Sequence, residues 1–260
     1  MLEQGRIFAD PLAMRILGSA VDAVVHDALE RPDRTRMRIF IAVRTRFSED
    51  ALAFALEKGV RQIVVLGAGL DTIAYRGTFP NPSHVFEVDH PATQAWKRQC
   101  LEDAAIPIPD SLTFVPVDFE HQTLAQGLAA AGFDPKQETF FSWLGVVPYL
   151  KEETVWSTLN FIASLPNRTH VVFDYSDRPE TLPTEWRADH EKNAARVADL
   201  GEAWVTFFTP AELHAKLRAI GFSEIEDLGP PQIAAHYFPN RRIEVPGKGG
   251  HILRATTIRT

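Results

Sequence analysis

Short apolar runs recur through the middle of the chain, separated by stretches in which apolar residues follow a helical period. The runs are mostly apolar throughout, as strands covered on both faces should be. We predict strands at residues 62–66, 84–88, 112–117, 139–144 and 169–174. Helical patterns lie between them, at 93–104, 123–131 and 151–164. This alternation predicts an α/β fold with a central, mostly parallel sheet covered by helices on both faces, in which the strand-helix-strand unit occurs at least four times.

The N-terminal part and one polar stretch fall outside this alternation. Residues 1–60 predict helices at 10–17, 21–29 and 35–58. The stretch 177–201 is polar and carries two prolines ahead of a helical run. Both segments are predicted to be additions to the core, the first as a helical cover and the second as an inserted lid.

The C-terminal part resumes the regular pattern. A helix over 210–220 is expected to stop at Gly221. Strands near 223–227 and at 251–258 flank a loop rich in proline and glycine, and they predict a terminal hairpin added to the sheet. We therefore predict one domain over residues 1–260. Its parts, in chain order, are the N-terminal cover, the ligand-binding half of the sheet, the inserted lid and the C-terminal helix with its strands: 1–60, 61–176, 177–206 and 207–260.

Composition and charge narrow the function classes. The chain has 27 Lys and Arg against 34 Asp and Glu, and the net charge of -7 disfavours a generic nucleic-acid partner. A single cysteine, Cys100, excludes an intramolecular disulfide and cysteine-based zinc sites. The nine histidines form no H-x-x-x-H pair, so no metal site is expected. No run reaches the roughly 18 apolar residues of a membrane span, and we expect a cytoplasmic protein with small-molecule partners.

A glycine turn follows the first predicted strand directly, with the sequence GAGLDT at residues 67–72. Gly67 and Gly69 allow the backbone to turn tightly and approach a ligand, and the N-terminus of a following helix is expected to point at it. Thr72 stands where a dinucleotide fingerprint places its third glycine. A nicotinamide cofactor therefore becomes the second choice.

Acidic residues end the next two predicted strands. Glu87 and Asp89 lie about twenty residues past the glycines, where nucleotide folds place a ribose-binding carboxylate, and alternation puts them on one side of the strand. Asp118 and Phe119 follow the third strand and suit an adenine amino group and ring. Any one acid fits a solvated strand end or a helix cap equally well. The ordered set favours adenosine.

An adenosine ligand without a phosphate site suggests S-adenosylmethionine, which also needs an anchor for its carboxylate. Arg44 and Arg46, on the helix before the first strand, offer guanidinium groups that match a carboxylate bidentately.

The sequence at this point resembles the leucine carboxyl methyltransferase-like group of class I S-adenosylmethionine-dependent methyltransferases, in its bacterial small-molecule members. The matching segments span nearly the whole chain in order: DPLAMRILG at 10–18, RTRF at 44–47, QIVVLGAGLDTIAYR at 62–76, FEVDHP at 86–91, VDFE at 117–120, SWLGVVPYL at 142–150 and FFTPAELHAKLRAIGF at 207–222. The resemblance implies a Rossmann-like methyltransferase domain.

The resemblance also implies roles for single residues. Arg44 would hold the cofactor's carboxylate, Asp89 the ribose, and Asp118 with Phe119 the adenine. The residues that would line the methionine end belong to the glycine turn: Gly67, Ala68, Gly69 and Asp71. Glu87 is a candidate for a supporting role in the cofactor site. Leu144 replaces a glutamate that eukaryotic members carry, so a backbone carbonyl near 142–145 is expected to meet the ammonium.

The implied reaction is in-line transfer of a methyl group to a carboxylate or hydroxyl of a small molecule, assisted mainly by alignment. Trp143, Tyr149 and Tyr175 could border the acceptor, although aromatic residues at strand ends more often serve packing. The residues predict neither the general base, nor the acceptor, nor the oligomeric state. Methylation of nucleic-acid or protein nitrogen, or cofactor binding without catalysis, are the alternatives. Enzymes that methylate nucleic-acid nitrogen commonly carry an Asn/Asp-Pro-Pro-aromatic run after the fourth strand, whereas this chain has GVVPY at 145–149.

Overall fold

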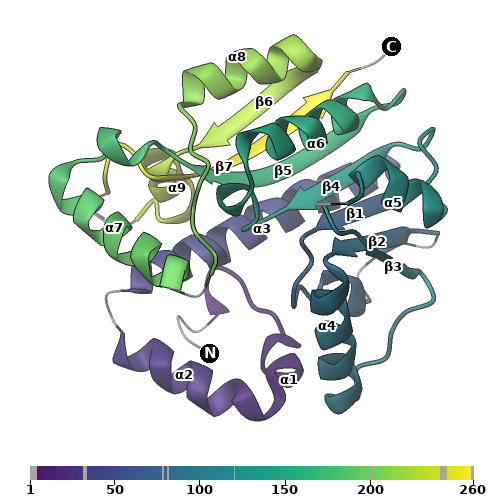
Figure 1. The fold of residues 1–260 in the computed structure, drawn as a ribbon, viewed down its shortest axis with the longest axis horizontal. Coiled ribbons are helices and arrows are strands. Elements are labelled where there is room, and N and C mark those ends of the chain that lie inside the picture. Colours follow the sequence, from purple (N-terminus) through teal and green to yellow (C-terminus); the bar gives the residue numbers. More distant parts are fainter. Residues whose placement is uncertain are drawn as a thin grey trace. The chain divides into compact units, whose positions relative to one another are not determined.

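The computed structural model describes residues 5–31, 34–77, 79–80, 82–119, 121–199, 201–240 and 245–258. Within these residues, seven strands form the sheet, in the order β3-β2-β1-β4-β5-β7-β6 (Figure 1). Their bounds are β1 Gln62–Leu66, β2 His84–Asp89, β3 Leu112–Pro116, β4 Thr139–Trp143, β5 Thr169–Ser176, β6 Phe222–Leu228 and β7 Gly250–Thr257. The mostly parallel α/β fold predicted from the pattern is confirmed.

The chain divides into two compact units, Met1–Phe140 (unit 1) and Phe141–Thr260 (unit 2). The α-helices described in unit 1 are α1 Ala13–Leu17, α2 Val21–Glu30, α3 Thr35–Glu57, α4 Pro91–Asp103 and α5 Leu124–Ala130. Those described in unit 2 are α6 Glu152–Ser164, α7 Thr184–Asp199, α8 Pro210–Ile220 and α9 Pro230–Tyr237.

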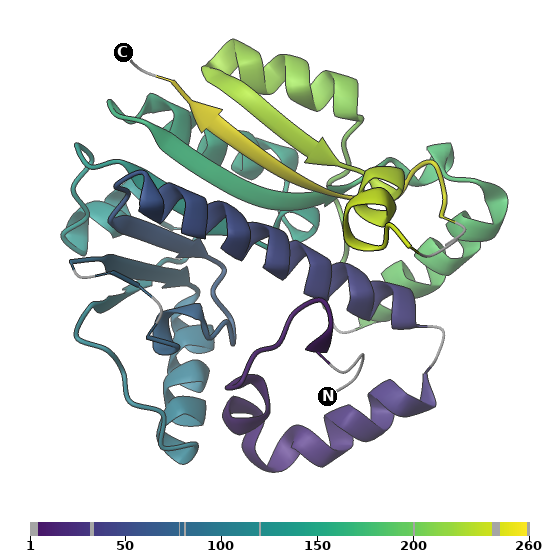
Figure 2. The same cartoon turned by 180° about the vertical axis from the view of Figure 1, so that it is seen from behind.

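In unit 1, β1 pairs with β2 and β2 with β3, both in parallel. The long helix α3 lies on one face of these strands and α5 on the other (Figures 1 and 2). The buried stripe of α3 repeats every four residues, through Val43, Phe47, Ala51 and Ala55, as one helix face should. Helix α5 packs so closely here that a Cβ on Gly127 would lie 3.4 Å from a methyl of Val115 in β3 and 2.4 Å from a methyl of Val117, just after the strand.

In unit 2, β7 pairs antiparallel with both β5 and β6, which confirms that the last strands join the sheet as an antiparallel pair. Helices α6 and α8 cover one face of these strands (Figure 1). Gly221 ends α8 with a φ of 118°, a left-handed conformation that glycine adopts without strain. The predicted stop signal is therefore confirmed.

Two expectations about helices were wrong. Among the described residues between β1 and β2, the helical element is a 3-10 turn, η4 Ile73–Tyr75, and no α-helix follows the glycine turn. Gly77, Pro80 and Pro82 interrupt the segment, so three of the expected four strand-helix-strand units contain an α-helix. The C-terminal loop contains α9, in which prolines occupy the first turn, where their missing N–H groups are not needed.

Across the described residues, helices long enough for a bilayer lack the apolar character to cross it.

Candidate functional site

The glycine loop, residues 67–73, sits at the carboxyl end of β1. Gly67 and Gly69 have φ angles of 63° and 42°, in the left-handed region that glycine tolerates best. The N–H groups of Gly67 and Ala68 donate to the carbonyl of Val88 at 2.8 and 3.2 Å, which ties the loop to the end of β2. The loop therefore presents bare backbone at the edge where the parallel strands of unit 1 end.

Asp89 ends β2 beside this loop. Its Oδ2 accepts a hydrogen bond from the N–H of Gly69 at 2.6 Å, and its Oδ1 accepts one from the N–H of His90 at 2.7 Å. A carboxylate has about four acceptor positions, so each oxygen keeps capacity for a further donor. Asp89 is thus held in place with acceptors left for a pair of neighbouring hydroxyl groups.

Asp118 and Phe119 follow β3 at the same edge, because β3 runs parallel to β2 with Pro116 opposite Asp89. The carboxylate of Asp118 lies 3.1 Å from Nδ1 of His121, and the Phe119 side chain is 42% exposed. The exposed ring offers a flat apolar surface next to an acceptor.

Glu87 has a different environment from Asp89. Its side chain is buried, 2.8 Å from Nζ of Lys97, and Tyr75 donates its hydroxyl to it at 3.1 Å. Burial raises the pKa of Glu87 to about 7, against the opposing charge of Lys97. Alternation places both acids of β2 on one side of the strand, and the contact of Glu87 with Lys97 links β2 to α4. These contacts are of the kind that a supporting role for Glu87 requires.

Two further candidates of unit 1 are Asp71, within the glycine loop, and Arg44 of α3. Asp71 accepts a hydrogen bond from the N–H of Ile73 at 2.7 Å and so fixes the start of η4. Arg44 lies on α3, half-buried, and its Nε is inaccessible to solvent.

The unit 2 candidates fall into two groups. Trp143 and Tyr175 are 2% and 1% exposed and pack around Phe173, so core packing, the alternative already considered, describes them better than a pocket rim. Tyr149, in the 3-10 turn η5 Val147–Tyr149, is half-buried. Leu144 follows β4 and precedes Gly145, which has a φ of 72°.

Asp174 of β5 was not foreseen. It is 4% exposed, and its Oδ1 accepts a hydrogen bond from the N–H of Gly145 at 2.6 Å. The loop after β4 is therefore held by a buried carboxylate next to Leu144. An acid within a predicted buried strand was the signal that could have marked it, because such groups stay buried only with partners.

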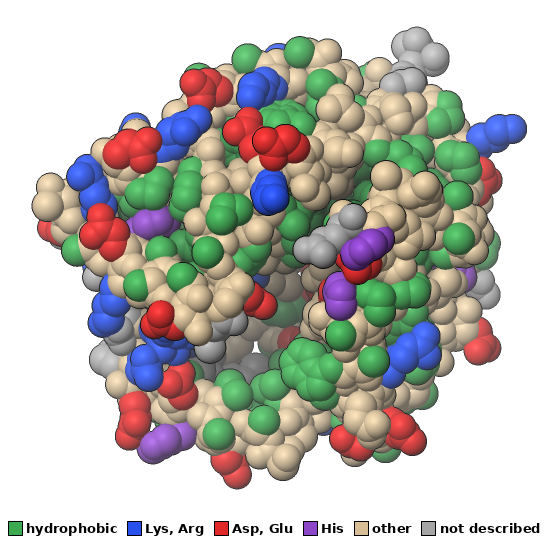
Figure 3. Space-filling view, in the orientation of Figure 1, with side chains coloured by type: hydrophobic (Ala, Val, Ile, Leu, Met, Phe, Trp, Pro, Cys, Tyr) green, Lys and Arg blue, Asp and Glu red, His purple; other side chains and the backbone are tan. Residues whose placement is uncertain are grey.

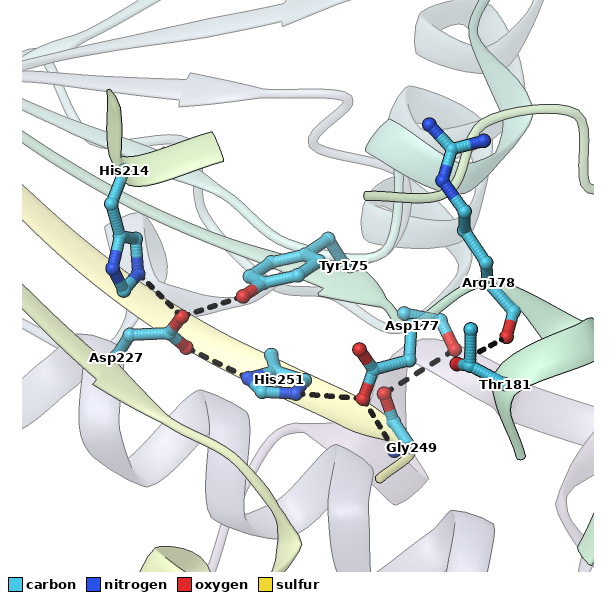
Figure 4. A network of polar contacts seen from close by, with 9 residues as sticks. Tyr175, Asp177, Arg178, Thr181, His214, Asp227, Gly249 and His251 are labelled. Atoms are coloured by element: carbon cyan, nitrogen blue, oxygen red, sulfur yellow. Dashed lines mark hydrogen bonds and ion pairs between the residues drawn. The ribbon is translucent and has the colours of Figure 1, made fainter. Parts of the chain in front are cut away.

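A polar network at the end of β5 was also missed (Figure 4). His251 of β7 lies between two carboxylates, with its Nδ1 2.9 Å from Asp227 and its Nε2 3.1 Å from Asp177. Asp227 also accepts the hydroxyl of Tyr175 at 2.5 Å and contacts His214 at 2.7 Å. Because these residues come from separate elements, their spacing in the sequence carries no signal.

Burial alone would lower the pKa of His251, but the hydrogen bonds and charges of Asp177 and Asp227 outweigh it and raise the pKa to about 9. A histidine whose pKa rises on folding stabilises the protein fully below its unfolded pKa of about 6.5, and that contribution is lost as the pH passes through the folded value. The free energy of unfolding should therefore fall by on the order of 3 kcal/mol between pH 6.5 and pH 9.5. Urea denaturation of the wild type and of His251→Gln checks this. An equal fall in both proteins would contradict it.

Solved structures share this architecture. A protein of Thermobifida fusca YX, provisionally named a methyltransferase, matches with a TM-score of 0.60 and 18% identity over 98% of both chains. A Bordetella parapertussis protein matches with a TM-score of 0.53 and 12% identity, over 84% of this chain and 70% of the other. The fold is that of the class I S-adenosylmethionine-dependent methyltransferases.

Sequence comparison is more specific. The sequence model of the leucine carboxyl methyltransferase family matches residues 2–163, and the chain belongs to this family. YktD of Bacillus subtilis, provisionally named an S-adenosyl-L-methionine-dependent methyltransferase, is 38% identical over 205 residues, 76% of this chain and 66% of YktD. A Mycolicibacterium smegmatis protein with the same provisional name is 38% identical over 173 residues, 65% of this chain and 54% of its own. The chain thus spans about half to two thirds of the length of these relatives.

Proposed function

We propose that the protein binds S-adenosyl-L-methionine and transfers its methyl group to a carboxylate or hydroxyl of a small molecule. The observation that carries the proposal is the placement of Asp89, whose carboxylate is fixed by the Gly69 N–H beside two left-handed glycines. A ribose offers two adjacent hydroxyl donors, which fit the remaining acceptor positions of that carboxylate.

The other residues of unit 1 fit the rest of this cofactor. Phe119 presents an exposed ring for adenine, and Asp118 an acceptor for its amino group. The bare backbone at Gly67, Ala68 and Gly69 allows close approach of the methionine part. Thr72, in place of a third glycine, is 2% exposed and its hydroxyl is engaged by Asp10, which argues against a dinucleotide at this loop.

The ends of the amino-acid part need opposite charges. Arg44 supplies a guanidinium for the carboxylate. For the ammonium, backbone carbonyls near Leu144 are proposed; Asp174 accepts a hydrogen bond from the N–H of Gly145 in the same loop. The cofactor supplies an electrophilic methyl group, so the protein's task is to align the acceptor and exclude water.

The proposed acceptor is a small molecule, and we propose a cytoplasmic location and no nucleic-acid or membrane partner. On the face shown in Figure 3, Lys and Arg are interspersed with Asp and Glu instead of forming one basic patch. Together with the net charge of -7, this mixing supports a partner other than a phosphate backbone.

Methyl transfer is tested with S-adenosylmethionine labelled in its methyl group and a panel of small carboxylic acids and phenols. We expect label in the product of at least one acceptor. A carboxylate acceptor is already ionised at neutral pH, so its rate should change little from pH 6 to pH 8, whereas a phenol's rate should rise. Label found only in added RNA or protein would favour the nitrogen-methylating alternative. Cofactor binding with no labelled product from any acceptor would favour a catalytically silent protein.

A further inference from the structure

Asp10 joins the N-terminal segment, residues 5–17, to the glycine loop. Its Oδ2 accepts a hydrogen bond from the hydroxyl of Thr72 at 2.6 Å, and its Oδ1 accepts one from the N–H of Leu12 at 2.8 Å. Thr72 is 2% exposed, so if Asp10 were removed, bulk water would replace it poorly as the acceptor of the Thr72 hydroxyl. The bond therefore connects the entry to α1 with the end of the loop that carries Gly67 and Gly69.

The same segment makes a second contact just past the loop. Arg76 lies with its guanidinium carbon 5.4 Å from the centre of the Phe8 ring, and it donates two hydrogen bonds to Glu49 of α3, at 2.5 and 3.1 Å. The Arg76 side chain is 10% exposed. Phe8 thus packs against the guanidinium of Arg76, which lies four residues after Thr72 and is held by Glu49 of α3.

Apolar packing joins the segment and the loop as well. Ile16 of α1 is 3% exposed and forms a cluster with Leu101 and Ile106. Leu12 of the segment and Leu70 of the glycine loop both pack against this cluster. The segment and the loop therefore share one apolar support inside unit 1.

One contact of the segment is independent of the loop. Arg15 donates to the carbonyls of Ala104 and Ala105, at 3.2 and 3.4 Å, beyond the end of α4. This contact holds α1 without touching residues 67–73, so it provides a matched control.

Besides its backbone bonds to Val88, the glycine loop is held by two carboxylates at positions three residues apart, Asp89 at Gly69 and Asp10 at Thr72. Two partners that order the same short segment assist each other, because the first to bind removes part of the conformational freedom that opposes the second. We propose that Asp10 is a positioning residue that makes docking of the N-terminal segment and cofactor occupancy of the glycine loop depend on each other. The inference rests on the proposed function for the identity of the cofactor.

Hydrogen exchange of residues 5–17, with and without S-adenosylhomocysteine, tests this coupling, and the affinity for that ligand is measured on the same samples. In the wild type, the ligand should slow exchange of the segment by about fivefold or more. Thr72→Val removes the hydroxyl while keeping the shape of the side chain. This variant should exchange faster without ligand, and the ligand should no longer slow its exchange. Because coupling is reciprocal, its affinity for the ligand should fall by the factor by which the ligand slows exchange in the wild type.

Three further variants isolate the hydroxyl. Thr72→Ser keeps it and should behave as the wild type. Asp10→Ala removes the same bond from the other side and should reproduce the loss if Thr72→Val fails to fold. Arg15→Ala should speed exchange without ligand yet keep the slowing by ligand.

Several results would overturn the inference. Full slowing in Thr72→Val, equal losses in Thr72→Ser and Thr72→Val, or an equal loss in Arg15→Ala would each show that the hydroxyl bond is not the connection. Ligand binding to the wild type without any change in exchange would overturn the coupling alone. Absence of binding to the wild type would overturn the proposed function itself, and the affinity measurement tells these two failures apart.

Discussion

Removal of residues 1–34 is expected to abolish methyl transfer while the rest of the chain stays folded. Within unit 1 this part of the chain carries Asp10, Phe8 and α1, which contact the glycine loop and the residues after it. Helix α2 has no buried residue among those described, and Val24 and Leu29 are 48% and 64% exposed. Such a helix contributes little to the core, so a role as a cover that positions the acceptor and excludes water fits it better.

The truncated protein is checked by circular dichroism, by turnover with labelled cofactor and by its affinity for S-adenosylhomocysteine. The affinity should fall less than in Arg44→Ala, because the arginine is proposed to touch the cofactor directly. Full activity of the truncated protein would show that the segment is dispensable. Loss of the fold would contradict the expectation that the remaining core is independent and would assign the segment a structural role.

Asp89→Ala is expected to weaken cofactor affinity by about 1 to 3 kcal/mol, roughly 5- to 150-fold, through loss of charge-assisted hydrogen bonds. The substitution also removes the acceptor that holds the N–H of Gly69, which adds to the loss. Asp89→Asn is the matched control, since its amide oxygen can still accept from Gly69, and it should lose less. Calorimetric titration measures both variants after urea denaturation has verified their fold. An unchanged dissociation constant in folded Asp89→Ala would make this residue an ordinary strand-end acid.

Much of the sheet could be predicted because strands covered on both faces are short, apolar and bounded by turns. The strand at residues 62–66 has the predicted bounds, and those at 84–88 and 112–117 differ by one residue at an end. Local chemistry also placed the end of α8, since Gly221 adopts the left-handed conformation that stops a helix.

The missed features depend on long-range contacts or on local exceptions. Where a helix was expected after the glycine turn, the chain forms only the short 3-10 turn η4, because Gly77 and two prolines follow it. Period-two alternation places Glu87 and Asp89 on one side of the strand, but it could not reveal Lys97 of α4, which pairs with the buried Glu87. The contacts of His251 with Asp177 and Asp227 span 74 and 24 residues of sequence, so only the folded chain brings them together.

The measurement that tests the central claim most directly is calorimetric titration of the wild-type protein, without added metal, with S-adenosylmethionine, S-adenosylhomocysteine and NAD in turn. The arrangement of Gly67, Gly69 and Asp89 predicts saturable binding of the first two ligands and none of NAD. Clear binding of NAD, with no heat from S-adenosylmethionine or S-adenosylhomocysteine, would contradict the account.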